Sequence, residues 1–166
     1  MTERLTAEAE MRRLIYTYAR AVDRLDRALL ASIFFTDAHV ELGAIYQGTP
    51  DGFLDVAMTF MGSMAATRHD VSNVLVCAET GGRFSAESYV QAWHRIETLD
   101  GTRELTVYGR YLTRIECRDG LWGIVWHSEI IDWARDAAAD PAWFDANNEM
   151  PKGQRDRDDG SYALFD

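Results

Sequence analysis

Hydrophobic residues near the start of the chain recur at the three- and four-residue spacing of an amphipathic helix. This stripe consists of Met11, Leu14, Ile15, Tyr18, Val22 and Leu25. Arginines fill much of the opposite surface, so the pattern predicts a helix that lies on a hydrophobic layer. Two shorter helices are expected over residues 26–34 and 52–64, with an extended segment over 38–46 between them.

The second half of the chain is typical of β-structure. Strands are predicted over residues 69–79, 83–98, 103–117 and 121–133. The segments between them carry Gly81-Gly82, Asp100-Gly101 and Asp119-Gly120, which favour tight hairpins. Consecutive hairpins give an antiparallel sheet, so the sequence predicts an α+β fold in which a strongly curved sheet wraps around the early helices.

Alternation within the strands predicts which side chains face the helices. His94 shares a face with the small apolar residues Val90 and Ala92, and Tyr111 belongs to the apolar face of the next strand. In the segment 121–133 both faces look buried, so the pattern does not fix the side on which His127 lies.

Composition limits the organisation and the partners of the chain. With 166 residues and 47% hydrophobic content, one compact domain over residues 1–140 is expected, large enough to enclose a ligand cavity. The remainder, residues 141–166, is expected to be a short helix and a flexible polar tail that forms a flap over the pocket. The net charge of -10 opposes binding to nucleic acid or to anionic membranes.

Other signals are missing from the sequence. The first residues have no apolar signal core, and no run approaches the roughly 18 apolar residues of a membrane span, so a cytoplasmic protein is expected. Cys77 and Cys117 lie in strand-like segments without metal-ligand spacing and are expected to be reduced core thiols. Glycine-rich phosphate motifs are absent and the single lysine, Lys152, lies in the tail, so neither a nucleotide nor Schiff-base chemistry is expected.

Three titratable residues from three predicted elements are the candidate chemistry. They are Asp23 at the end of the first helix, His69 at the start of a strand, and His94 in the next strand. An imidazole transfers protons near neutral pH, and a carboxylate partner fixes its tautomer, so the set predicts an acid–base enzyme. On an ideal helix Asp23 lies outside the apolar stripe, so the pattern alone favours a surface position, and either histidine alone also fits a structural role.

The segment Tyr16 to Asp26, the His69 segment, the turn Asp119-Gly120-Leu121-Trp122 and the order of elements resemble a known family. It is the SnoaL-like branch of the nuclear transport factor two-like superfamily, whose cystatin-like fold is an α+β cone. Within it, the chain is most similar to scytalone dehydratase, bile acid 7α-dehydratase and hexachlorocyclohexane dehydrochlorinase. These are lyases without cofactors, so the resemblance implies a metal-free lyase.

The resemblance also implies roles for individual residues. Asp23 and His69 match the catalytic pair of the family, His94 matches a second histidine of scytalone dehydratase, and Tyr18 matches a catalytic tyrosine of the bile acid enzyme. The water-holding tyrosines of scytalone dehydratase fall on Val22 and Leu42 here, so scytalone itself is not implied as the substrate.

These residues lead to the hypothesis of a dehydratase or related eliminase acting on an aromatic, polyketide-like or alicyclic molecule. His69, oriented by Asp23, takes a proton from carbon, and His94 or Tyr18 protonates the leaving group or stabilises an oxyanion. Packing in the core is an equally good interpretation of Tyr18. The expected substrate-binding residues are Tyr111, His127, Asn73 and Tyr46.

Alternative functions stay open at this point. The same pair suits a carbon–carbon lyase or an isomerase, and the fold also suits a non-catalytic β-subunit of a ring-hydroxylating dioxygenase or a small-molecule binding protein. Asp23, His69 and His94 also have the composition of a two-histidine, one-carboxylate iron site. By resemblance a homo-oligomer is expected, a trimer ahead of a dimer, formed through an apolar outer sheet face that carries Trp93.

Overall fold

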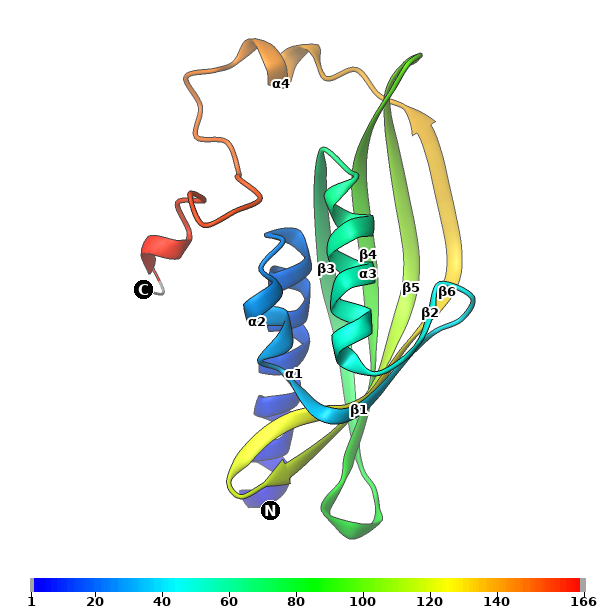
Figure 1. Ribbon diagram of the computed structural model, residues 1–166, viewed down its shortest axis with the longest axis vertical. Coiled ribbons are helices and arrows are strands. Elements are labelled where there is room, and N and C mark those ends of the chain that lie inside the picture. Colours follow the sequence, from blue (N-terminus) through cyan, green and yellow to red (C-terminus); the bar gives the residue numbers. More distant parts are fainter. Residues whose placement is uncertain (1, 165–166) are drawn as a thin grey trace.

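A six-stranded sheet curves around three helices in this protein, whose computed structural model describes residues 2–164 (Figure 1). These three helices are α1 (Thr2–Asp23), α2 (Arg27–Ala31) and α3 (Pro50–Gly62). A fourth helix, α4 (Ala142–Ala146), follows the last strand. The strands are β1 (Phe34–Leu42), β2 (Tyr46–Gly48), β3 (Ala66–Ala78), β4 (Phe84–Thr98), β5 (Gly101–Arg118) and β6 (Leu121–Ala138). This confirms the predicted α+β class with a curved sheet around the early helices. Among the described residues, no helix is long and apolar enough to cross a bilayer.

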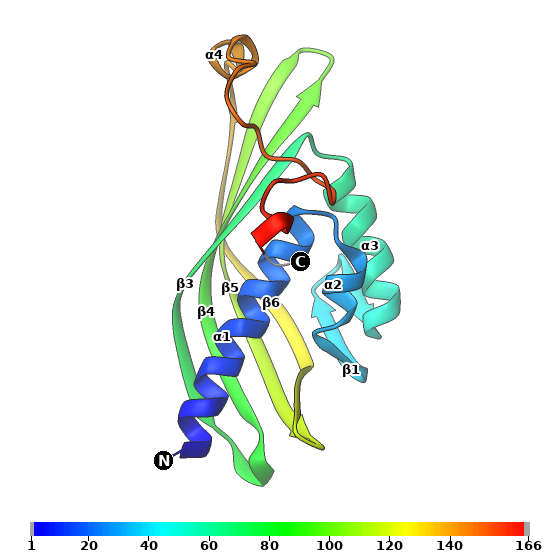
Figure 2. The same ribbon diagram turned by 90° about the vertical axis from the view of Figure 1, so that its left-hand side faces the viewer.

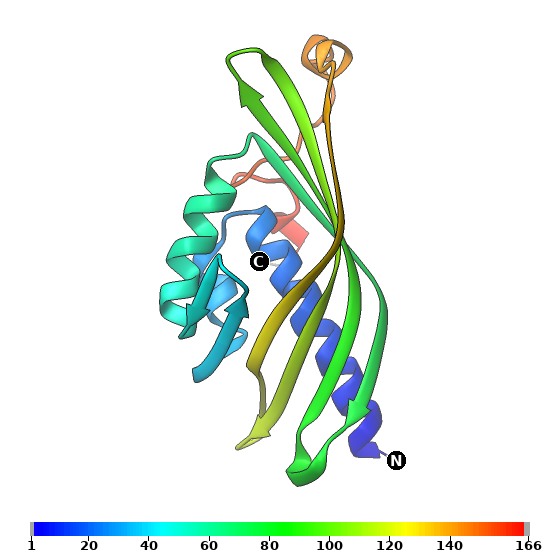
Figure 3. The ribbon, with the colours of Figure 1, turned by 90° about the vertical axis from the view of Figure 1, so that its right-hand side faces the viewer.

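The strands follow one another in the sheet as β2-β1-β6-β5-β4-β3. The four long strands β3 to β6 are joined as antiparallel hairpins, as the turn dipeptides predict. β1 runs parallel to β6, which makes the sheet mixed. Helices α1, α2 and α3 lie on one side of the sheet, inside its curve (Figures 2 and 3). The inner sheet face and these helices therefore enclose the hydrophobic core.

Several element boundaries differ from the predicted ones because tertiary pairing sets them. β3 begins at Ala66, three residues before the predicted start, since Ala66 pairs with Arg95 of β4. α2 ends at Ala31, and Phe34 already pairs with Ile124 of β6. The predicted helix over residues 26–34 is therefore too long by its last three residues.

Helix α1 ends in a way that turns its last residue toward the sheet. Leu25 adopts a left-handed conformation with φ of 53°, and the amide of Asp26 donates to the carbonyl of Ala21 at 2.9 Å. This is the Schellman arrangement that closes a helix. The side chain of Asp26 then caps α2 by accepting from the amide of Leu29 at 2.9 Å. Asp23 thus occupies the final turn of α1, facing β3.

A bulge in β6 explains why both faces of this segment look buried in the sequence. Ile115 of β5 pairs with Ile124, whereas the preceding residue of β5, Arg114, pairs with Trp126, so Val125 is an extra residue. A bulge shifts the alternation by one position. Ile124 and His127 are consequently both fully buried although they are three residues apart.

Both cysteines differ from the prediction. Cys77 and Cys117 are free, but both are exposed, so their assignment to the core is wrong. On β3 the bulge between Ser72 and Leu75 fixes the alternation so that Val76 is buried and its neighbour Cys77 faces outward. Cys117 lies one residue from the end of β5. Cys77 is thus exposed because it points to the outer face of the sheet, and Cys117 is exposed near the end of its strand.

The outer face of the sheet carries aromatic residues. Tyr89, Tyr108 and Trp133 are exposed there, and Tyr108 lies directly opposite Trp133 in the pairing of β5 with β6. On the same two strands, Arg110 of β5 forms a bidentate ion pair with Asp132 of β6, with nitrogen–oxygen distances of 2.9 and 2.8 Å. The expected homo-oligomer stays a prediction.

The C-terminal tail runs back from α4 to the end of α1 (Figure 2). Tyr162 is buried, and its hydroxyl donates to the carboxylate of Asp26 at 2.8 Å. Asp159 is also buried and accepts from the amides of Gln154 and Ser161. The tail is thus fixed against the helix end by specific hydrogen bonds.

Arg155 connects this tail to both helix ends. Its guanidinium donates to the carbonyl of Met61 in the last turn of α3 and to that of Met64 just after the helix, each at 2.6 Å. It also donates to the carbonyl of Asp23, the last residue of α1, at 3.3 Å. It also donates to the hydroxyl of Thr67 at 3.2 Å. Carbonyls in the last turn of a helix lack donors within the helix, so this one side chain supplies donors at the ends of both α1 and α3.

We predict that Arg155→Ala lowers the free energy of unfolding by about 2–3 kcal/mol, because it leaves these carbonyls without a charged donor. The measurement is chemical denaturation. Arg135→Ala, which removes the same charge from an exposed site on β6, is the control and is expected to change stability by less than about 0.5 kcal/mol. Equal midpoints for the two variants would contradict this role of Arg155.

Candidate active site

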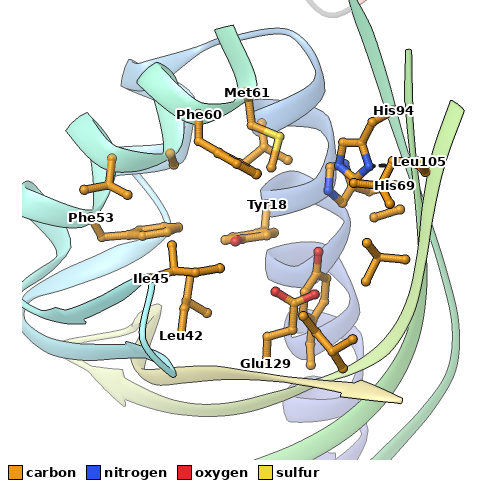
Figure 4. A pocket seen from close by; sticks show the side chains of 17 residues that line it. Tyr18, Leu42, Ile45, Phe53, Phe60, Met61, His69, His94, Leu105 and Glu129 are labelled. Carbon is orange, nitrogen blue, oxygen red and sulfur yellow. Dashed lines mark hydrogen bonds between the residues drawn. The ribbon is translucent and has the colours of Figure 1, made fainter. Parts of the chain in front are cut away.

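A cavity of about 130 Å³ lies between the helices and the inner face of the sheet (Figure 4). For comparison, a cavity of about 150 Å³ holds one benzene molecule. Its lining is mostly apolar and comes from α1, α3, the end of β1 and the loop after it, and strands β3 to β6. The lining residues are Tyr18, Val22, Leu42, Ile45, Phe53, Val56, Ala57, Phe60, Met61, His69, Ala92, His94, Leu105, Val107, Tyr111, Glu129 and Ile131.

Asp23 and His69 form a hydrogen-bonded pair at one wall of this cavity. The distance from Asp23 Oδ1 to His69 Nδ1 is 2.7 Å, and Asp23 Oδ2 accepts from the backbone amide of His69 at 2.9 Å. The hydroxyl of Thr67 donates to Asp23 Oδ1 at 2.8 Å. Asp23 is buried behind His69, so the structure places it inside although the helical pattern favours the surface. These bonds hold the carboxylate in a single orientation.

The hydrogen bonds also determine which proton each group carries. Burial raises the pKa of Asp23, but the hydrogen bonds and the charge of His69, together with the Thr67 hydroxyl, lower that pKa below its usual value overall. The ionised carboxylate of Asp23 accepts a hydrogen bond from Nδ1–H of His69. In the neutral form of the ring the free lone pair is then on Nε2. His69 thus presents a basic nitrogen to the cavity.

His94 lies beside His69 on the same face of the sheet, as the strand alternation predicts. The two rings are 5.7 Å apart and nearly perpendicular. Nδ1 of His94 lies 3.1 Å from the carbonyl of Leu105, an acceptor, so Nδ1 carries the proton. Burial and the charge of His69 lower the pKa of His94, although the Leu105 carbonyl and Asp23 raise it. His94 is therefore neutral near pH 7, and its Nε2 is an acceptor, which does not fit a role as the initial acid.

Two tyrosines bring hydroxyl groups to the cavity. The rings of Tyr18 and Tyr111 contact each other edge to face, with centroids 5.3 Å apart. Burial and the charge of Glu129 raise the pKa of Tyr18; burial and the neighbouring charges also raise the pKa of Tyr111. Both stay protonated, and neither hydroxyl makes a hydrogen bond within residues 2–164. Each is thus available as a donor to a ligand.

Glu129 is a cavity residue that the sequence analysis missed. It lies on β6 two residues after the buried His127 and directly opposite Tyr111 of β5. Burial raises the pKa of its carboxyl group, against a smaller opposite effect of His69. Glu129 lies two residues after His127, so strand alternation puts both side chains on the same face of β6. The bulge at Val125 shifts the alternation, and the sequence therefore does not reveal which face of β6 points inward. Thr67, which holds Asp23, was missed as well.

Three predicted substrate-binding residues do not line the cavity. His127 is fully buried behind Tyr18, with ring centroids 4.7 Å apart, and burial lowers its pKa to about 3, so the ring is neutral. The hydroxyl of Tyr46 donates to the carbonyl of Thr49 at 2.7 Å. Asn73 is exposed in the bulge of β3 with φ of 50°. Of that group, the structure brings only Tyr111 to the cavity.

The side chains do not converge as a metal site. Among the described residues, no three His, Cys, Asp or Glu side chains are arranged as ligands of one ion. Nδ1 of His69 bonds to Asp23 itself, and Nδ1 of His94 faces the Leu105 carbonyl. Asp23 and His69 are therefore hydrogen-bonded to each other and do not point toward a common ion. This geometry does not support the iron-site alternative.

Solved structures with this fold are similar over most of the chain. The type 2 hexachlorocyclohexane dehydrochlorinase LinA is 22% identical with a TM-score of 0.75, covering 85% of this chain and 98% of that chain. The LinA-type3 enzyme from Novosphingobium barchaimii LL02 is 20% identical with a TM-score of 0.75, covering 84% and 95%. A protein described as a candidate scytalone dehydratase from Novosphingobium aromaticivorans is 21% identical with a TM-score of 0.72, covering 84% and 94%. These similarities establish the fold.

A comparison with curated protein sequences gives no significant match. The comparison with protein families does, because the SnoaL-like domain matches residues 3–126. That match includes α1, the curved sheet as far as the first part of β6, and the residues Asp23, His69 and His94. Sequence and structure agree, and the chain belongs to the SnoaL-like domain family.

Proposed function

We propose that this protein is a lyase that eliminates water or a similar group from a small ring compound, without a cofactor. The single observation that carries this proposal is the Asp23–His69 pair, with 2.7 Å between Oδ1 and Nδ1, at the wall of an apolar cavity. An imidazole held in this way is a general base whose Nε2 faces the ligand. The dehydrochlorinase and the candidate dehydratase among the structural neighbours agree with this chemistry.

The reaction begins when Nε2 of His69 takes a proton from a carbon atom next to an electron-withdrawing group. Asp23 stabilises the imidazolium that forms, since its carboxylate already bonds to Nδ1. Tyr18, a neutral hydroxyl in the same cavity, donates a hydrogen bond to the oxyanion that develops on the substrate. His94, an acceptor at Nε2, binds a hydroxyl proton of the substrate.

The cavity limits the size and polarity of the substrate. About 130 Å³ fits a single six-membered ring, and the apolar lining suits an aromatic or alicyclic one. Ile45, Phe60 and Ile131 line the cavity and are also exposed, so they mark its mouth. Substituents on the ring extend outward between these side chains.

A direct test uses a β-hydroxycyclohexanone, a single ring in which a carbonyl acidifies the carbon that loses the proton. The protein is expected to accelerate its dehydration to cyclohexenone, measured by the ultraviolet absorbance of the conjugated product. Ring compounds with other hydroxyl positions and with halogen substituents complete the panel. If ligands of this panel bind and all leave chemically unchanged, the protein is a binding protein and the lyase proposal is overturned.

A further inference from the structure

Glu129 is an unusual group at the wall of an otherwise apolar cavity. Figure 4 shows its carboxyl group turned toward the space in front of Tyr18, with His69 on the adjacent wall. No residue among 2–164 makes a hydrogen bond to this side chain, and the hydroxyls of its neighbours Tyr18 and Tyr111 are also without one. Glu129 is half-buried, and it also borders the surface depression beside Leu42, Ile45 and Ile131. Its carboxyl group is therefore free to contact a ligand that enters the cavity.

The charges around the cavity set the protonation state of Glu129. Among the described residues, the lining of the cavity contains no arginine or lysine. Arg155 bonds to the carbonyl of Asp23 and to the hydroxyl of Thr67, on the far side of the catalytic pair. Burial therefore dominates and raises the pKa of Glu129, as an apolar site does for other carboxylic acids. The neutral form carries a proton that can be transferred.

We propose that Glu129 is the general acid of the reaction and that the leaving group is therefore a hydroxyl. This deepens the proposed function and rests on it. The two nitrogens that face the cavity, Nε2 of His69 and of His94, are both acceptors at the start of the reaction, so neither supplies this proton. The raised pKa of Tyr18 makes it a hydrogen-bond donor but a weak acid. Glu129 is the remaining group with a transferable proton.

The elimination moves two protons and forms one carbon–carbon double bond. The bond between the α-carbon and its hydrogen breaks, the proton goes to Nε2 of His69, and the electron pair forms the carbon–carbon double bond. The bond between the β-carbon and oxygen breaks, and the hydroxyl takes the proton of Glu129 and leaves as water. His69 then releases one proton to solvent and Glu129 takes up one, which restores the starting state.

A halide would not need this group. Chloride leaves as an anion and requires no proton, and a carboxyl group that ionises beside it would repel it. The carboxylic acid at position 129 therefore favours a β-hydroxy carbonyl compound over a halogenated ring as the substrate class.

The test compares a β-hydroxycyclohexanone with its β-chloro counterpart, since both give cyclohexenone. Glu129→Gln keeps the shape and a hydrogen-bond donor but has no proton to transfer. It is expected to lower kcat for the hydroxy compound by about 10²- to 10⁴-fold and for the chloro compound by less than about tenfold, after subtraction of the uncatalysed rate. Glu104→Gln, the same change at an exposed position of β5, is the control. Equal losses for both compounds would overturn the role of Glu129.

A second measurement does not depend on turnover. Carboxyl-carbon NMR of glutamate-labelled protein is expected to show one group, absent from Glu129→Gln, that titrates above the usual range of glutamate near 4.3. Titration of Glu129 within that range overturns the proposal even if no substrate is converted. Failure of the wild-type protein on both ring compounds, with a raised pKa at Glu129, counts instead against the lyase function.

Discussion

Replacing His69 with alanine is expected to lower kcat/KM for elimination by about 10²- to 10⁴-fold, the usual contribution of a placed general base. The reason is the position of its Nε2, which faces the cavity while Nδ1 bonds to Asp23 at 2.7 Å. The other cavity imidazole does not replace it, because His94 lacks a carboxylate partner and the burial of its ring disfavours the charged form. The measurement is initial rates on a β-hydroxycyclohexanone for each folded variant.

His39→Ala is the matched control, since His39 is exposed on β1 and outside the cavity. It is expected to keep wild-type activity. The His69→Ala protein should retain its circular dichroism spectrum. His69 lies on β3, which is held in the sheet by backbone hydrogen bonds to β4, and the substitution does not remove them. Wild-type rates in a folded His69→Ala protein would remove His69 from the mechanism.

Replacing Asp23 with asparagine is expected to reduce the rate by a similar factor through the tautomer of His69. The backbone amide of His69 needs an acceptor at the Oδ2 position, so the asparagine oxygen occupies that place and its NH₂ group faces Nδ1. This NH₂ group donates to Nδ1, and the ring then carries its proton on Nε2. The nitrogen that faces the substrate is no longer a base, although the geometry is kept.

The tautomer is observable apart from turnover, by nitrogen NMR of labelled histidine. The proton of His69 is expected on Nδ1 in the wild-type protein and on Nε2 in Asp23→Asn. Asp70→Asn, a change at an exposed carboxylate one residue after His69, is the control. If Asp23→Asn leaves both the tautomer and the rate unchanged, the pair does not act as proposed.

Stability in acid gives an independent readout for Asp23. Its pKa is lower in the folded state than the unfolded value near 3.9, so its ionisation stabilises the fold above that pH. This contribution is lost as the pH falls below the unfolded value and through the folded one. The difference in unfolding free energy between the wild-type and Asp23→Asn proteins should therefore shrink as the pH is lowered below about 4.

The sequence determined the elements and the direction of several side chains. Hairpin dipeptides and alternation predicted the order of β3 to β6 and placed His94 and Tyr111 on the inner face, because a strand has a strict two-residue period. Helical spacing likewise predicted the buried stripe of α1. These features depend on local geometry, which a pattern records directly.

Only the tertiary structure decided the contents of the cavity. Asp23 lies outside the apolar stripe of α1, and it is buried because the turn after α1 directs it onto Thr67 and His69. The bulge at Val125 places Glu129 in the cavity, and strand pairing rather than composition fixes that bulge. Arg155, in a tail that looks flexible in sequence, bonds to both helix ends. Contacts between distant segments depend on register and on irregularities of the backbone, and hydrophobic periodicity records neither.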